Sequence, residues 1–333
     1  MKIAILGAGA MGSLFGGLLA EAGAEVTLLD VNQQHLDAIR HDGLRLETDD
    51  RACRLFNLAA CRPEECREIP DLLMVFTKTH QIARALGSAR HLLGPSTWIL
   101  TLQNGLGNVE AISAFVPRGR ILVGVTTIPA DFLGPAHIAS HGAGFIRMGT
   151  ADRSADGGEH DSADCCMLCQ VVALFTRAGL RATADPNVWA AIWEKVAFNA
   201  AFNALCAATG CKVEQLQLVP SGPQMLLAVI AEAIEVAHAC GVPADLERTQ
   251  AMALKCFTTH ASHQPSMLQD IVAGRRSEID SIDGAIVHAA HLHGVPVPYT
   301  EMLYTLVSLI DARQALPASS RARGDHEAVA VSS

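Results

Sequence analysis

A chain of 333 residues exceeds one ordinary compact domain and is long enough for two, each with its own apolar core. Lys and Arg number 25 against 34 Asp and Glu, which gives a net charge of −9, and basic residues nowhere gather among aromatic ones. This composition argues against a nucleic-acid partner. The 10 cysteines are scattered through apolar segments, which is typical of reduced thiols rather than of a disulfide framework.

Two features of the sequence bear on where the protein acts. Residues 1–6 are apolar but run directly into glycines, without the charged start and cleavage site of an export signal. The longest uncharged stretches, 196–211 and 216–231, contain Asn, Gln or Pro and fall short of a membrane span. We therefore expect a cytoplasmic protein with no membrane association.

The chain begins with the pattern of a parallel sheet. Residues 2–6 predict a buried strand, a glycine turn follows, and residues 11–22 predict a helix that ends at Gly23. A second strand is expected at 25–29. Strand, turn, helix and strand in about thirty residues form the repeating unit of an α/β fold.

The same alternation continues to about residue 126. Further strands are expected at 72–77, 98–102 and 121–126, with helices at 33–40, 79–86 and 109–114. This order predicts an N-terminal Rossmann-like, doubly wound sheet. The segment 137–148 alternates around Gly142 and Gly144, and we expect it to form an antiparallel hairpin that finishes the sheet.

The second part of the chain is predicted to be all-helical. It follows an exposed loop expected at 152–164. Helices are expected at 167–178, 188–208, 224–240, 246–258, 278–293 and 300–313. We place the dinucleotide-binding domain at 1–186, the helical domain at 187–314 and a disordered tail at 315–333.

The glycines of the first turn have the spacing of a dinucleotide-binding motif. In the run GAGAMG, Gly7 permits a tight turn, Gly9 allows close approach of a pyrophosphate, and Gly12 allows the helix to pack closely on the strand. The helix N-terminus would face the phosphates with unpaired N–H groups. The expected cofactor-binding residues of this turn are Gly7, Ala8, Gly9, Ala10, Met11 and Gly12.

Asp30, at the end of the second strand, indicates which nicotinamide cofactor is used. A carboxylate there can accept hydrogen bonds from the adenosine ribose and would repel a 2′-phosphate, so NADH is favoured over NADPH. The next basic residues, Arg40 and Arg45, lie far along the chain from this position. The alternative is a solvated Asp30 that begins a turn with Asn32.

A polar stripe runs along the apolar helix expected at 188–208. Lys195, Asn199 and Asn203 are four residues apart, so they share one face of the helix. Burial of an ammonium and two amides without partners is costly, and the stripe must therefore face polar groups. Lys195 could donate a proton to a carbonyl oxygen while the amides hold a substrate's carboxylate and hydroxyl oxygens. A network between helices or a wet groove is the alternative.

Taken together, these residues and further motifs resemble the ketopantoate reductase family from residue 1 to about 313. The motifs are the glycine turn, Lys78 in VFTKTHQ, Asn104 in QNGLG, WEK with Asn199 and Asn203, SMLQD at 266–270 and SEID at 277–280. The resemblance implies reduction of 2-dehydropantoate or a similar 2-oxo acid by a nicotinamide cofactor, a step of pantothenate biosynthesis.

The resemblance also implies roles for individual residues. Lys195 would be the general acid, and Glu278 would orient this lysine and contact substrate. Asn199, Asn203 and Ser266 would hold substrate, whereas Lys78 and Asn104 would lie at the nicotinamide end of the cofactor. For Asp270 and Asp280 we expect structural capping and pairing.

The chain departs from the family at two positions. NADPH-dependent members, the family's usual kind, carry a basic residue where this chain has Asp30, and a proline commonly stands where this chain has Ala204. Two alternatives therefore stay open: an NAD-dependent D-2-hydroxyacid dehydrogenase for branched or aromatic substrates, and a dinucleotide-binding sensor without turnover. No metal site is expected, because the pair Cys166 and Cys169 has no second pair at ligand spacing. The apolar C-terminal helices are compatible with a homodimer.

Overall fold

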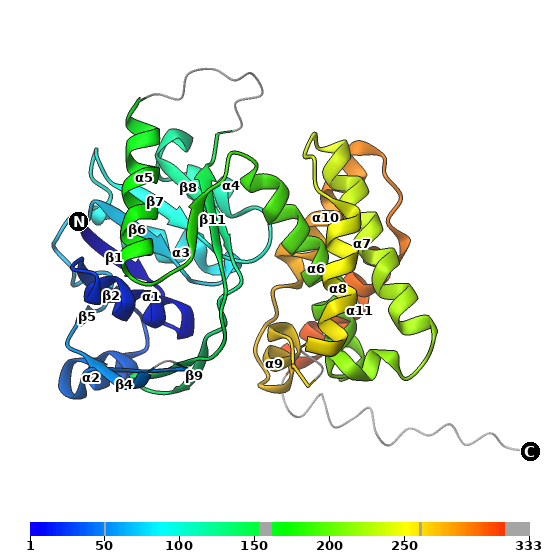
Figure 1. The fold of residues 1–333 in the computed structure, drawn as a ribbon, viewed down its shortest axis with the longest axis horizontal. Coiled ribbons are helices and arrows are strands. Elements are labelled where there is room, and N and C mark those ends of the chain that lie inside the picture. Colours follow the sequence, from blue (N-terminus) through cyan, green and yellow to red (C-terminus); the bar gives the residue numbers. More distant parts are fainter. Residues whose placement is uncertain (50, 153–161, 260–261, 317–333) are drawn as a thin grey trace, which may run out of the picture. The chain divides into compact units, whose positions relative to one another are not determined.

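The computed structural model describes residues 1–49, 51–152, 162–259 and 262–316. Contacts divide the chain into two compact units, Met1–Ile192 and Trp193–Ser333, with the division inside helix α6 (Val188–Thr209). Figure 1 shows the first unit built around a sheet and the second built from helices. Residues 317–333 of the predicted tail and 153–161 of the predicted loop lie outside the described residues, and 162–164 belong to a helix.

The first unit contains an eight-stranded sheet. Its strand order is β12-β11-β8-β7-β6-β1-β2-β5, in which the strands from β8 to β5 are parallel and β11 runs antiparallel to β8. The bounds are β1 Lys2–Leu6, β2 Glu25–Leu29, β5 Ala59–Cys61, β6 Leu72–Val75, β7 Trp98–Thr101, β8 Ile121–Thr126, β11 Ile146–Thr150 and β12 Ala182–Ala184. Because successive strands are added on opposite sides of β1, the order reverses there, which is where such folds bind ligands.

Both faces of this sheet are covered by apolar helices, as predicted. Ile3 and Ile5 of β1 belong to one core with α1, α2 and α5, whereas Ala4 and Leu6 belong to the other with α3 and α4. Alternate residues of a strand point to opposite faces, so an almost wholly apolar strand serves both cores. The bounds are α1 Ala10–Glu21, α2 Gln33–Asp42, α3 Ile82–Ser88, α4 Asn108–Ser113 and α5 Ser162–Arg177.

A second, four-stranded sheet was not predicted. Its order is β4 (Arg51–Phe56), β3 (Leu44–Thr48), β10 (His137–Ser140) and β9 (Asp131–Gly134). Helix α1 packs against both sheets, and it does so through adjacent glycines. A Cβ on Gly16 would lie 2.7 Å from Leu28 of the main sheet, and one on Gly17 would lie 2.5 Å from Leu46 of the small sheet.

The expected hairpin over 137–148 is therefore wrong. Strand β10 pairs with β3 and β9 in the small sheet, whereas β11 pairs with β8 in the main sheet. The intervening Gly144 passes close to Ile128, whose N atom would lie 2.5 Å from a Cβ at this position. The sequence pattern marked two strands correctly, but the partner of each strand is decided by packing around α1.

The second unit is helical in all its described residues that have regular structure. Its helices after α6 are α7 Ser221–Ala239, α8 Leu246–Thr259, α9 Ser266–Val272, α10 Asp283–His293 and α11 Pro298–Ala315, with 3₁₀ turns η4 Val213–Gln217 and η5 Ile279–Ser281. Helix α7 packs against α8, α10 and α11, and Glu232 on α7 caps α11 by accepting the backbone N–H groups of Tyr299 and Thr300. Within the described chain, no helix is both long and apolar enough to cross a membrane.

Candidate active site

The glycine turn joins β1 to α1 at the point where the strand order reverses. Gly7 has φ +99°, a conformation that favours glycine, and a Cβ on Gly12 would lie 2.0 Å from the Gly7 carbonyl oxygen. Gly9 is different: it is exposed, and a Cβ there would have no heavy atom within 4 Å. The predicted turn at Gly7 and the close packing at Gly12 are thus confirmed. The open side of Gly9, beside the first N–H groups of α1, fits the approach of a phosphate.

Asp30 is held within this turn by backbone hydrogen bonds. Its Oδ2 accepts the N–H of Ala8 at 2.7 Å, and its Oδ1 accepts the N–H of Asn32 at 2.8 Å. Asn32 in turn caps α2, because its side chain accepts the N–H of His35 at 3.2 Å. The turn with Asn32, which the sequence offered as the alternative, is therefore present. It leaves further acceptor positions on the carboxylate, since each oxygen has two lone pairs.

His35 is linked by hydrogen bonds to the glycine turn through Ser13 and to the small sheet through Ala136. The buried ring accepts the Ala136 N–H at Nδ1 (2.9 Å), and its Nε2 lies 3.2 Å from Ser13 Oγ, which donates to the Ala8 carbonyl at 2.7 Å. Burial lowers the pKa of His35, which keeps the ring neutral and able to accept at Nδ1. The network ties α1, α2 and the small sheet to the glycine turn.

Lys78 and Asn104 lie in loops that follow the neighbouring strands β6 and β7. Asn108, which is buried, joins these loops: its Oδ1 accepts from Thr79 Oγ1 at 2.9 Å, and its Nδ2 donates to the Asn104 carbonyl at 3.2 Å. The backbone of Thr77 also touches Gly7, because a Cβ on that glycine would lie 2.8 Å from the Thr77 nitrogen. The sheet therefore brings both loops to the edge that carries the glycine turn.

Lys195 and Glu278 come together in the helical unit. Lys195 is partly buried on α6, and burial lowers the pKa of its ammonium to about 8 despite the opposing effect of the nearby Glu278 carboxylate. Asn199 is partly buried and Asn203 is buried on the same face of α6. A pKa near 8 suits a lysine that exchanges a proton at neutral pH.

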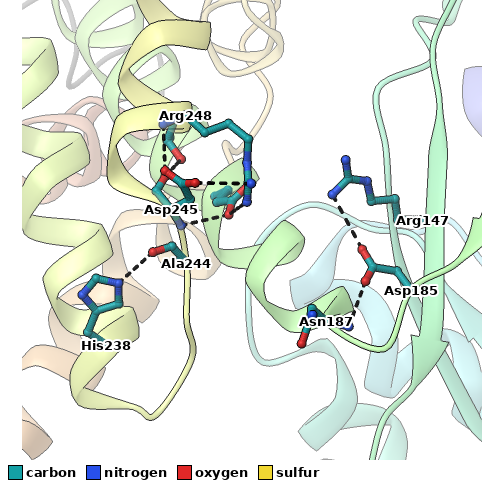
Figure 2. A network of polar contacts seen from close by, with 9 residues as sticks. Arg147, Asp185, Asn187, His238, Ala244, Asp245 and Arg248 are labelled. Atoms are coloured by element: carbon teal, nitrogen blue, oxygen red, sulfur yellow. Dashed lines mark hydrogen bonds and ion pairs between the residues drawn. The ribbon is translucent and has the colours of Figure 1, made fainter.

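Glu194, next to Lys195, forms contacts between helices that the sequence did not reveal. Its buried carboxylate accepts the Asp245 N–H at 2.9 Å and Arg248 Nε at 3.1 Å, and it forms a further bond to Arg248 Nη2. Figure 2 shows Asp245 and Arg248 together at the start of α8, where Asp245 also accepts the Arg248 N–H at 2.8 Å. The pair fixes α6 to α8 beside the lysine.

The start of α6 is fixed separately within the first unit. Asp185 accepts the Asn187 N–H at 2.8 Å and lies 3.7 Å from Arg147 of β11, as Figure 2 shows. A carboxylate before the first turn of a helix stabilises the unpaired N–H groups there. The first turn of α6, within Met1–Ile192, is therefore anchored to β11.

Of the remaining candidates, Asp270 and Asp280 have structural partners, whereas Ser266 is exposed. Ser266 begins α9 and is exposed, with Pro265 rather than Ser266 in the N-cap position. Asp270 pairs with Arg275 at 2.8 Å and Asp280 pairs with Arg276 at 2.8 Å, so the pairing expected for both is confirmed. Neither Cys166 nor Cys169 is in a disulfide, and no group of three or more metal-ligating side chains occurs in the described part of the chain.

The fold and these residues define the class of protein. A doubly wound sheet with a glycine turn at its switch point is the arrangement of dinucleotide-binding proteins, and a partly buried lysine with a lowered pKa is typical of acid–base chemistry. Comparison with known proteins gives the family. The profile described as "Ketopantoate reductase PanE/ApbA" matches residues 3–153, and "Ketopantoate reductase PanE/ApbA C terminal" matches residues 187–311. The chain belongs to the ketopantoate reductase family.

Curated relatives agree over nearly the full length. The chain is 33% identical over 313 residues to a 2-dehydropantoate 2-reductase of Streptococcus pyogenes, covering 94% of this chain and 98% of that protein. It is 33% identical over 320 residues to the 2-dehydropantoate 2-reductase of Halobacterium salinarum, covering 93% and 98%. These relatives are oxidoreductases, as the sequence predicted for this chain.

Solved structures extend the comparison. D-mandelate dehydrogenase, in a ternary complex with NADH and anilino(oxo)acetate, is 29% identical with a TM-score of 0.87, covering 95% of this chain and all of that one (100%). A structure described as "Putative 2-Dehydropantoate 2-Reductase from Enterococcus faecalis" is 30% identical with a TM-score of 0.73, covering 95% of this chain and 100% of that one. Both sequence hypotheses for an enzyme, the ketopantoate reductase and the D-2-hydroxyacid dehydrogenase, thus have a structural relative.

Proposed function

We propose that the protein reduces 2-dehydropantoate, or a closely similar 2-oxo acid, to the 2-hydroxy acid with a nicotinamide cofactor. The observation that carries the proposal is Lys195, partly buried beside Glu278 and with its pKa lowered to about 8, in a chain of the ketopantoate reductase family. With 2-dehydropantoate as substrate the reaction would belong to pantothenate biosynthesis. Residues 1–186 would form the dinucleotide-binding domain and residues 187–314 the substrate domain.

The cofactor would be held by the sheet unit. The residues proposed to bind it are Gly7, Ala8, Gly9, Ala10, Met11, Gly12, Asp30, Lys78 and Asn104. The bound dinucleotide supplies a hydride to the carbonyl carbon of the substrate. Asp30 favours NADH, because its negative charge repels a phosphate on the ribose and its lone pairs accept from ribose hydroxyls. NADPH is the family's usual alternative.

The helical unit would supply the proton and hold the substrate. Lys195 donates a proton to the carbonyl oxygen as negative charge develops there, and Glu278 orients the ammonium and keeps it protonated. Asn199, Asn203 and Ser266 would donate hydrogen bonds to the carboxylate and the oxygen atoms of the substrate. Neutral amides and a hydroxyl suit this task, because they can donate without adding a charge that must be neutralised.

Replacement of Lys195 tests the mechanism. We expect Lys195→Ala to lower kcat for 2-oxo acid reduction by about 10² to 10⁴-fold, because the proton donor is lost. Lys255→Ala, which removes an exposed lysine of α8, is the matched control and should retain wild-type activity. Unchanged turnover in Lys195→Ala would disprove the role of the lysine. Absence of turnover in the wild-type protein would favour the dinucleotide sensor.

The second enzymatic candidate is a D-2-hydroxyacid dehydrogenase for branched or aromatic substrates. The similarity to D-mandelate dehydrogenase with bound NADH favours it, as does Asp30. Reduction of 2-dehydropantoate, 2-oxoisovalerate and phenylglyoxylate, each measured with NADH and NADPH, separates the candidates by kcat/KM. A preference for phenylglyoxylate would replace the first proposal with the second.

We also propose that the protein forms a homodimer and acts in the cytoplasm. Helix α11 carries the exposed residues Tyr299, Met302, Leu306 and Leu309, whose spacing of three, four and three residues places them on one face. Two copies of such a face can pack against each other. A monomeric mass in light scattering of the wild-type protein would disprove the dimer, and cell fractionation tests the location.

A further inference from the structure

The carboxyl ends of β2 and β5 bring a second charged residue to Asp30. The two strands are parallel, with Leu29 opposite Cys61, and the Asp30 N–H donates to the Cys61 carbonyl at 3.3 Å. Asp30 and Arg62 therefore follow their strands at the same edge of the sheet. The sequence separates them by a long segment, and neither Arg40 nor Arg45 is the arginine that the strand pairing places beside residue 30.

The guanidinium of Arg62 reaches the residue after Asp30. Its Nη1 donates to the Val31 carbonyl at 3.2 Å, and Val31 itself is 63% exposed. In the described part of the chain this guanidinium forms no ion pair, whereas the neighbouring Arg40 lies 3.6 Å from Asp37. The Arg62 side chain is half-buried, so its position is restrained. An arginine without an ion pair in the described residues, whose backbone N–H donates to Glu65 Oε2 at 3.2 Å, therefore lies at the same sheet edge as Asp30.

The Asp30 carboxylate is held in place by backbone hydrogen bonds. Both of its oxygens are engaged by backbone N–H groups, from Ala8 on one side and Asn32 on the other. A fixed carboxylate suits the hydroxyl of a ribose, and a guanidinium suits a phosphate, to which it can donate two parallel hydrogen bonds. The site thus combines a group that favours an unmodified ribose with one that favours a phosphorylated ribose.

We propose that Arg62 is a specificity-determining residue that binds a 2′-phosphate on the adenosine ribose, so that the protein accepts NADPH as well as NADH. The inference rests on the proposed function only in that the glycine turn binds a dinucleotide. Asp30 and Arg62 then act in opposite directions on the choice of cofactor. The balance between them, rather than Asp30 alone, sets the preference.

Binding of two nucleotide fragments tests this without any turnover. By titration calorimetry, Arg62→Gln should weaken binding of 2′,5′-ADP about tenfold, because a charge-assisted pair to the phosphate is lost. Binding of 5′-AMP, which lacks the 2′-phosphate, should change by less than about twofold. Arg62→Lys keeps the charge but not the two parallel hydrogen bonds, and its affinity for 2′,5′-ADP should lie between those of the wild type and Arg62→Gln. Arg177→Gln, at the exposed end of α5, is the matched control and should change neither affinity.

A double-mutant cycle sharpens the result. Asp30→Asn should raise affinity for 2′,5′-ADP in the wild-type background and much less in Arg62→Gln, because both residues act on the same phosphate. Equal loss of both fragments in Arg62→Gln, or loss of neither, overturns the proposal. If the wild-type protein binds neither fragment, the glycine turn is not a dinucleotide site, and the proposal for Arg62 is disproved as well. Binding of both fragments with no reduction of any 2-oxo acid overturns the proposed function alone.

Discussion

The two groups of candidate site residues, one in each unit, are held in place by different kinds of contact. Around the glycine turn, backbone N–H groups hold Asp30, and Asn108 joins the loops of Lys78 and Asn104 that follow neighbouring strands. Beside Lys195, the fixing contact joins two side chains, Glu194 and Arg248, that are 54 residues apart. The first group is placed by sheet topology. The second depends on Glu194, which binds Arg248 and the Asp245 N–H, so substitutions in the two groups should have different effects.

The largest effect is expected from Gly12→Ala in the glycine turn. The added methyl group would lie 2.0 Å from the Gly7 carbonyl oxygen, so the turn or the helix must move. We expect the free energy of unfolding to fall by about 3 kcal/mol or more, measured by urea denaturation, together with loss of nucleotide binding.

Gly9→Ala is the matched variant that separates packing from binding. Its φ of −66° suits alanine and its methyl group would meet no atom within 4 Å, so stability should be retained. Binding of NADH should nevertheless weaken if phosphate approaches this side of the turn. Equal stability of the Gly12 and Gly9 variants would contradict the packing role of Gly12, and unchanged NADH affinity in Gly9→Ala would contradict the phosphate site.

In the helical unit, we expect replacement of Arg248 to lower the free energy of unfolding more than replacement of its partner Glu194. The Glu194 side chain is 9% exposed and that of Arg248 is 54% exposed. Arg248→Met leaves a buried carboxylate without its cation and should cost about 3 kcal/mol of unfolding free energy. Glu194→Gln leaves an arginine that can return to water and should cost about 1 kcal/mol. Thermal and urea denaturation measure both, and a larger loss in Glu194→Gln would refute this account of the pair.

The smallest effect concerns the pH dependence of the reaction. Lys195 must be protonated to act as an acid, so kcat/KM for reduction should fall as pH rises through about 8. Glu278 raises the lysine pKa, and Glu278→Gln should therefore move the fall to lower pH. The control is Glu247→Gln, at an exposed position of α8. A pH profile that is identical in Glu278→Gln and the wild type would show that Glu278 does not act on Lys195.

The residues that sequence reasoning placed correctly have local causes. Gly7 and Gly12 could be assigned because the turn and the helix packing involve neighbours a few residues away. The stripe of Lys195, Asn199 and Asn203 follows from helical periodicity alone. Their catalytic and binding roles stay predictions, since they depend on a substrate and cofactor rather than on the helix.

The wrongly predicted hairpin and the unpredicted small sheet depend instead on contacts between distant parts of the chain. Strand β10 finds its partners in β3 and β9, and the packing of α1 on two sheets, through Gly16 and Gly17, decides this. Nothing in the alternation at 137–148 encodes such a choice, because period-two patterning specifies a half-buried face and not a partner strand.

The sequence by itself determined the alternation of strands and helices, the glycine turn, the polar face of α6 and the family resemblance. These are set by backbone conformation and by apolar periodicity over short distances. Only the tertiary structure decided that Glu194 is paired with Arg248, that Asp30 is locked by the N–H of Ala8, and that Arg62 lies beside it. Contacts of this kind join strand ends and helix faces far apart in the chain, so their charge and geometry exist only once the fold has formed.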